Sequence, residues 1–197
     1  MDEITVETKI GSIKGEVHVR TIEPFGDPLR VRQFLGVPYA EPPIGALRFE
    51  KPKMKHKMNE VYDATKYGPS CLQMHMDFLG ERKPASETGL PESSNDCLVL
   101  NIFSTPDNLD GNTFGGDPNK VTLFGGSAGG ASVIFQAMYP GNKGLIKRII
   151  PQSGSVTCPW VYQRDSLQNA KRIANLVGCP TDVETFQLAS CLRKYSR

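Results

Sequence analysis

The chain has 197 residues, of which 39% are hydrophobic and 22% are charged. This composition is too apolar for a disordered chain and can supply a core, so one domain or part of a larger one is expected. The 23 basic and 21 acidic residues give a net charge of +2, which argues against a nucleic-acid partner held by phosphate contacts. No apolar run approaches the about 18 residues that a transmembrane helix needs.

The N-terminal half of the chain favours strands. Apolar and polar residues alternate over residues 4–8 and 13–19, which predicts a polar β-hairpin, and residues 31–37 predict a third strand. Residues 51–94 show little periodicity and are expected to form a long surface segment with at most one helical turn. The basic cluster at the start of this segment contains no aromatic residue, so a solvated loop is favoured over a phosphate- or heparin-binding patch. The apolar residues 97–103 predict a strand of the kind that is buried in a parallel sheet.

The C-terminal half contains alternating signals for strands and helices. Residues 121–124 predict a strand, residues 128–138 a helix that Pro140 ends, and residues 148–152 a short strand weakened by its proline.

Two further helices are expected in the last third of the chain. The first begins at Asp165 or Ser166, carries apolar residues on one face and ends before Gly178, which suits the left-handed position after a helix. The second begins with a capping-box pattern at residues 181–184 and runs to about Lys194.

The cysteines leave the cellular compartment open. No C-x-x-C pair occurs, and His18 and His56 lie far from the cysteines in sequence, so no metal site is expected. Two cysteine pairs and one free thiol would suit a secretory or extracellular compartment, whereas the N-terminus lacks the features of a signal peptide and indicates the cytoplasm. The five residues are Cys71, Cys97, Cys158, Cys179 and Cys191.

Residues 125–129 form a G-x-S-x-G motif between a predicted strand and a predicted helix. In a nucleophile elbow of this kind, the sharp reversal crowds the backbone, so glycines flank a serine with strained φ and ψ. Ser127 would then project its hydroxyl, and the amide of Ala128 would point at a developing oxyanion near the positive helix terminus. The alternative is a Gly-rich turn in which Ser127 only caps the helix.

Residues 114–132 (FGGDPNKVTLFGGSAGGAS) closely resemble the active-serine segment of type-B carboxylesterases, the carboxylesterase/cholinesterase family. Three further stretches are similar to this family, at residues 34–43 with 47–49, 96–101 and 152–160. The resemblance runs from about Val6 to Lys194. It implies a partial α/β-hydrolase fold, with a mixed sheet, helices and an N-terminal β-hairpin.

The resemblance also implies the roles of individual residues. Ser127 matches the acylating nucleophile, Ala128 the oxyanion amide, and Trp160 a residue near the acyl pocket. The implied substrate is a small-molecule carboxylic ester, and no metal or organic cofactor takes part. The implied disulfides join Cys71 to Cys97 and Cys179 to Cys191, which leaves Cys158 as a small core residue.

Several departures from the family pattern bear on activity. Gly126 replaces a glutamate beside the serine, and Asn95 replaces the glutamate partner of Arg48, which removes an ion pair. Only residues 104–113 separate the strand at 97–103 from the next family motif, where the family has strands, a helix and the His-Gly-Gly-Gly oxyanion loop. We therefore expect residues 1–197 to be a partial carboxylesterase domain, with an internal deletion near 110–114 and its C-terminal part missing.

The catalytic triad of this family cannot be completed from these residues. The order in the fold is serine, acid, histidine, yet the three histidines, His18, His56 and His75, all precede Ser127 and are interpreted as surface residues. A serine without its base is a poor nucleophile, so the chain is expected to be catalytically impaired. The alternative is a non-catalytic, esterase-like interaction or adhesion module. Phosphate binding by the glycines ranks last, because neither phosphate-loop motif is present.

Overall fold

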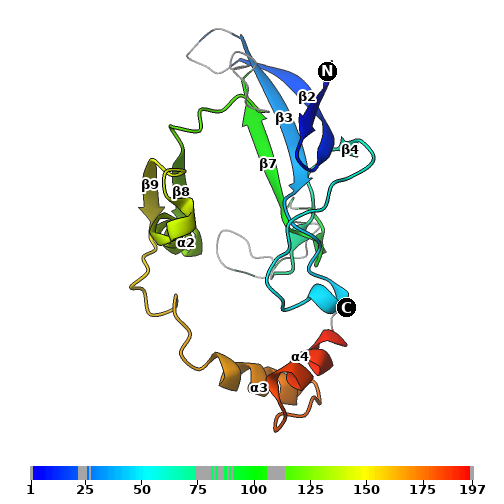
Figure 1. The fold of residues 1–197 in the computed structure, drawn as a ribbon, viewed down its shortest axis with the longest axis vertical. Coiled ribbons are helices and arrows are strands. Elements are labelled where there is room, and N and C mark those ends of the chain that lie inside the picture. Colours follow the sequence, from blue (N-terminus) through cyan, green and yellow to red (C-terminus); the bar gives the residue numbers. More distant parts are fainter. Residues whose placement is uncertain are drawn as a thin grey trace. The chain divides into compact units, whose positions relative to one another are not determined.

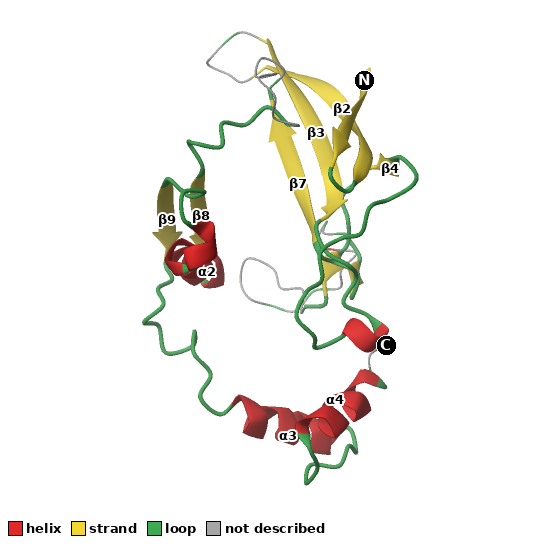
Figure 2. Ribbon diagram, in the orientation of Figure 1, coloured by secondary structure: helices red, strands yellow, loops and turns green. Residues whose placement is uncertain are grey.

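The computed structural model describes residues 2–21, 26, 28–73, 81, 83, 87, 89, 91–105 and 114–195 (Figure 1). It divides into two units, Met1–Gly116 and Asp117–Arg197. Strands dominate the first unit, whereas the second combines a strand pair with helices (Figure 2). The architecture is thus α/β, as predicted. In the part of the chain that is described, none of the helices has the length and apolarity needed to span a membrane.

The first unit is built on a twisted sheet with strand order β1-β2-β3-β7. The predicted hairpin is confirmed, because β1 pairs antiparallel with β2 and places Val6 opposite Ile13. β2 also pairs antiparallel with β3 and parallel with the short β4, and β3 pairs antiparallel with β7. The bounds are β1 (Asp2–Thr8), β2 (Gly11–Thr21), β3 (Pro28–Pro38), β4 (Tyr62–Asp63) and β7 (Val99–Ser104).

The core of the first unit lies on one face of this sheet, around Phe34. Ile13, Val37 and Ala64 are buried with it, and the ring of Phe114 meets the ring of Phe34 edge-on at 5.1 Å between centroids. A side chain at Gly15, on the neighbouring strand, would collide with the Phe34 ring. The largest core residue therefore requires a glycine opposite it.

The environment predicted for β7 was wrong. The strand exists, but it pairs antiparallel with β3 rather than within a parallel sheet, and Leu100 and Phe103 are 40% and 54% exposed. β3 is the only named strand with which β7 pairs among the described residues. An apolar strand with one paired edge and one covered face cannot bury every side chain.

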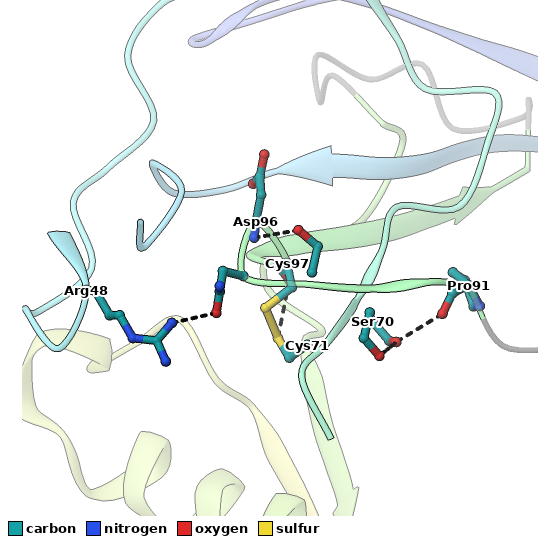
Figure 3. The surroundings of a disulfide bond; sticks show 9 residues. Arg48, Ser70, Cys71, Pro91, Asp96 and Cys97 are labelled. Carbon is teal, nitrogen blue, oxygen red and sulfur yellow. Dashed lines mark hydrogen bonds between the residues drawn. A yellow bond between two sulfur atoms is a disulfide. The ribbon is translucent and has the colours of Figure 1, made fainter. Parts of the chain in front are cut away.

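The prediction of a surface segment over residues 51–94 was only partly right, because β4 joins the sheet and Ala64 is buried in the core, whereas most of the other described residues are exposed or partly buried. A two-residue pair, β5 (Ser70–Cys71) with β6 (Ser93–Ser94), closes part of it, while the short 3₁₀ turn η1 (Gly45–Leu47) lies just before it. A disulfide joins Cys71 to Cys97 beside this pair (Figure 3). The disulfide therefore fastens the middle of the segment to the residues that precede β7.

Arg48 keeps a partner at the position where an ion pair was expected to be lost. Its Nη1 donates a hydrogen bond of 2.8 Å to Oδ1 of Asn95, next to the disulfide (Figure 3). The guanidinium also lies 5.0 Å from the centroid of the Phe49 ring. The amide of Asn95 thus provides Arg48 with a neutral acceptor and links the two loops.

The carboxylate of Glu41 binds two residues of the basic cluster, Lys55 and His56, and we call this arrangement the Glu41 clamp. The carboxylate of Glu41 accepts hydrogen bonds from the His56 backbone N–H at 2.7 Å and from Lys55 Nζ at 3.2 Å, and it pairs with His56 Nδ1 at 2.7 Å. The Glu41 backbone N–H donates to the carbonyl of Lys53 at 2.9 Å. The sequence predicted a solvated loop, and the structure differs in part, because Glu41, which follows β3, binds Lys55 and His56 of this loop. These donors, the His56 backbone N–H first, lower the pKa of Glu41 from 4.5 to about 2.

The second unit begins with a β-α-β crossover. β8 (Thr122–Gly126) pairs parallel with β9 (Arg148–Gln152), and α2 (Ala128–Met138) connects them together with the turn η2 (Pro140–Asn142). The bounds of α2 and β9 are those predicted from the sequence. Ala131 and Val133 are buried, and α2 packs on β8 and β9 (Figure 1). A crossover helix of this kind is what parallel neighbours require.

The unit ends with the helices α3 (Ser166–Leu176) and α4 (Thr185–Arg193). Gly178 has φ 76°, as expected for the residue after α3. A disulfide joins Cys179 to Cys191, and Ala174, Cys179 and Leu188 form a small core. The capping box of the last helix forms three residues later than predicted. The Gln187 side chain accepts a hydrogen bond from the Glu184 N–H, so the capping box joins Glu184 to Gln187.

We predict that replacing Cys179 and Cys191 with serine opens the α3–α4 pair. The disulfide closes a loop with a separation of 12 residues, and a loop of that size contributes about 3 kcal/mol by constraining the unfolded chain. The three-residue core is too small to compensate. Amide hydrogen exchange at Leu188 should accelerate by about 100-fold. Cys158→Ser is the control and should leave exchange unchanged; equal exchange in the double variant would contradict the prediction.

A second prediction concerns acid stability. Because the folded pKa of Glu41 is depressed, its ionised form stabilises the fold above pH 4.5, and this stabilisation is lost as the pH falls toward about 2. The side-chain carboxyl of Glu41, followed by NMR, should titrate near pH 2. Glu41→Gln should lower stability at pH 7 and have little effect at pH 2, whereas the exposed Glu60→Gln should have little effect at either pH. A midpoint near 4.5 would refute the clamp.

Candidate active site

Ser127 lies between the end of β8 and the start of α2 in a strained conformation. Its φ is 54° and its ψ is −117°, so a residue other than glycine occupies a region that side chains rarely adopt. Such strain costs about 1–3 kcal/mol and persists only where the surroundings impose it. The predicted strained turn is confirmed. The Ser127 side chain makes no hydrogen bond to the first turn of α2, which removes the interpretation of Ser127 as a simple helix cap.

The flanking glycines allow the reversal. A Cβ on Gly125 would lie 2.6 Å from the carbonyl carbon and oxygen of Gly129, and a Cβ on Gly130 would lie 2.8 Å from the carbonyl oxygen of Gln152. Both positions are therefore closed to side chains. Gly126, in contrast, has no atom within 4 Å of its ideal Cβ, so the missing glutamate leaves open space beside the serine.

A second turn, at residues 152–154, holds the elbow in place. The Ser127 N–H donates to the carbonyl of Gln152 at 2.8 Å, and the Ser127 carbonyl accepts from the Ala131 N–H at 3.2 Å. A Cβ on Gly154 would collide with the Ser127 carbonyl oxygen. Ser153 itself has φ 52°, so two strained serines follow two paired strands. The sequence offered only the resemblance at 152–160 as a sign that this turn belongs to the site.

The N-terminus of α2 supplies the electrostatics of the elbow. The first N–H groups of any helix lack intrahelical acceptors, and the helix dipole places partial positive charge there. The first turn of α2 contains no acidic residue that would offset this charge. The Ala128 amide lies at the first helical position, and its role as an oxyanion donor stays a prediction.

The structure assigns two of the three histidines to other partners. His18 Nε2 lies 2.9 Å from the carboxylate of Glu16, on the same strand, and His56 is held by Glu41. His75 lies outside the described residues. Residues 117–197 contain no histidine, so the second unit brings no imidazole to Ser127 from its own sequence.

The segment after the second turn carries the remaining candidates. Trp160 is 54% exposed, and its role in an acyl pocket stays a prediction. Cys158 is the free cysteine of the described chain and is only partly buried, so its interpretation as a core residue was wrong. Its Sγ instead accepts a hydrogen bond of 3.3 Å from the Ser155 N–H, within a local turn. Across the described residues, no group of three His, Cys, Asp or Glu side chains is arranged to hold a metal ion.

We predict that Gly154→Ala and Gly126→Ala have opposite effects. The first adds a methyl group against the Ser127 carbonyl and should destabilise the elbow by about 1–3 kcal/mol. The second fills open space within a strand and should be neutral or stabilising, by up to about 1 kcal/mol. Hydrogen exchange of the Ala131 amide reports the difference, since that amide bonds to Ser127. Equal protection in both variants would show that the second turn does not hold the elbow.

Comparison with known proteins places this geometry in a family. The model of the carboxylesterase family matches residues 2–113 and 112–197. The chain is 61% identical to bile salt-activated lipase of Bos taurus over 80 residues, which is 41% of this chain and 13% of the relative. The corresponding lipase of Homo sapiens is 55% identical over 80 residues, 41% of this chain and 10% of the relative.

A longer match covers almost the whole chain. Acetylcholinesterase 4 of Caenorhabditis briggsae is 28% identical over 274 residues, which span 98% of this chain and 44% of the relative. The chain therefore spans less than half the length of this relative, and the alignment is longer than the chain itself. Because the family model matches both units, the chain belongs to the carboxylesterase family.

Proposed function

We propose that Ser127 is the acylating nucleophile of a serine carboxylic-ester hydrolase. The observation that carries the proposal is its strained elbow between β8 and α2, with the hydroxyl not engaged as a helix cap. Family membership supports ester hydrolysis, and the names of the relatives, a lipase and an acetylcholinesterase, agree with an ester substrate. The substrate class is a small-molecule carboxylic ester.

The elbow supports a two-step reaction. The Ser127 oxygen attacks the ester carbonyl carbon, and the Ala128 N–H donates to the carbonyl oxygen as it becomes negative. The alcohol leaves with a proton, and an acyl-serine remains. Water then attacks the acyl group and releases the carboxylic acid. Trp160 is the residue that we assign to the acyl side of the site.

These 197 residues by themselves are proposed to catalyse this reaction poorly. A serine hydroxyl becomes a good nucleophile only when a base removes its proton, and residues 117–197 contain no histidine. Residues 104–113 are also too few for the crossover and second oxyanion loop that the resemblance implies. Two findings support an internal deletion there. The family model matches in two segments that meet at residues 112–113, and the acetylcholinesterase alignment exceeds the chain in length.

A non-catalytic interaction module is the second candidate. It is favoured by the same missing histidine and by the glycine at position 126, which leaves no carboxylate beside the serine. The strained serine argues against it, because an interaction surface has no need for a conformation that costs free energy. The reactivity of Ser127 distinguishes the two candidates.

The test is covalent labelling with a fluorophosphonate, combined with hydrolysis of p-nitrophenyl acetate. Losing one oxyanion donor costs about 10²–10³ in turnover and losing the base costs more, so hydrolysis should exceed the buffer rate only slightly. Labelling should be slow, should map to Ser127 and should vanish in Ser127→Ala. Ser132→Ala, one turn further along α2, is the matched control and should label normally.

Three outcomes would change the proposal. Labelling that persists in Ser127→Ala would remove Ser127 as the nucleophile. Complete absence of labelling would favour the interaction module. Saturable turnover that Ser127→Ala abolishes would confirm the nucleophile and refute the impairment.

A further inference from the structure

The charge of the chain is unevenly divided, which the net value of +2 conceals. Residues 117–197 contain ten Lys and Arg residues and only four Asp and Glu residues. No acidic residue occurs between Asp117 and Asp165, the stretch that contains β8, α2 and β9. Lys120 pairs with Asp117 at 3.2 Å and Arg164 precedes Asp165. The other cations of this stretch, Lys143, Lys147 and Arg148, have no acidic neighbour in sequence.

Three of these cations line one pocket. It has a volume of about 270 Å³ and lies where the end of α2, the loop after η2 and the start of β9 meet. Lys143, Lys147 and Arg148 contribute charge, and Ala137, Ile146 and Ile149 contribute apolar surface. No ion pair joins any of the three cations to an acidic group among the residues that the structure describes. All three side chains are exposed, so their charges are accessible to an anionic ligand from solvent.

The backbone around the pocket is rigidly built. The N–H of Lys143 donates to the carbonyl of Pro140 at 3.2 Å, and the N–H of Lys147 donates to the carbonyl of Val121 at 2.8 Å. The Asn142 side chain donates to the carbonyl of Gln136 at 2.9 Å and to its side-chain oxygen at 2.8 Å. A loop that is already ordered loses little conformational entropy on binding, so the pocket is prepared for a ligand.

We propose that this pocket binds a small amphipathic anion, namely an anionic headgroup carrying a short alkyl chain. The Arg148 fork and the two lysines suit a carboxylate or a phosphate, and Ile146 and Ile149, both partly buried, suit the chain. The volume lies just below the about 300–1,000 Å³ of sites for drug-sized ligands, which favours a ligand of few atoms. The site is separate from Ser127 and does not depend on ester hydrolysis.

Equilibrium dialysis of the full chain against radiolabelled hexanoate tests the proposal. Saturable binding with a Kd of about 1 mM or tighter is expected for a ligand of this size. Unlabelled hexyl phosphate should compete, and the strength of each competitor tells a carboxylate preference from a phosphate preference. Acetate, which lacks the chain, and hexanol, which lacks the charge, should each compete at least about tenfold more weakly.

Variants locate the site. Lys143→Gln, Lys147→Gln and Arg148→Gln together should weaken hexanoate binding by about tenfold or more. The matched control, Arg164→Gln, Arg172→Gln and Lys194→Gln, removes the same charge elsewhere in the unit and should change binding less than about twofold. Lys143→Arg with Lys147→Arg should keep binding, and so should Ser127→Ala, since neither removes charge from the pocket.

Four results would overturn the proposal. These are no saturable binding at tenfold higher hexanoate, equal loss in the control variant, equal competition by hexanol, and loss of binding in Ser127→Ala. Loss of binding in Ser127→Ala would place the hexanoate site at the elbow, which is the proposed ester site, and not in this pocket.

Discussion

The second unit depends on the contact between two turns that follow two parallel strands. The Ser127 N–H reaches the Gln152 carbonyl, and Gly154 lies so close to the Ser127 carbonyl that no side chain fits between them. Because β8 and β9 are paired in register, Gly126 opposite Gln152, both turns begin at the same level of the sheet. The strain at Ser127 is therefore imposed by a neighbouring strand as well as by its own glycines, and the elbow forms only where β9 is also in place.

This dependence explains how a short segment can by itself hold Ser127 in a strained conformation. The strand, the helix and the second turn lie within residues 122–154, and their contacts are local to the second unit. A general base and a second oxyanion loop require other segments of the chain. The conformation of the serine and its activation by a base are thus separate properties. We assign only the conformation to these residues.

Much of this organisation could be predicted from the sequence. The bounds of α2 follow from its apolar periodicity and from Pro140, and the end of α3 follows from Gly178, because each signal acts on its own backbone. The glycines of the elbow could likewise be identified from the sequence next to Ser127 alone. The exposure of β7, the Glu41 clamp and the position of the last capping box could not be predicted, since each depends on which distant or competing partner a residue meets. The role of the second turn, at residues 152–154, was missed for the same reason, because Gly154 is constrained by Ser127, which lies 27 positions earlier.

The conformation of Ser127 is the most direct test of this account. An experimental structure of the full chain, or NMR couplings that report φ, should give a positive value near 54° with the Ser127 N–H bonded to the Gln152 carbonyl. The account would be contradicted by a negative φ in the extended region, with the serine hydroxyl bonded to the first-turn amides of α2. That result would make Ser127 an ordinary helix cap and would remove the basis for the proposed nucleophile.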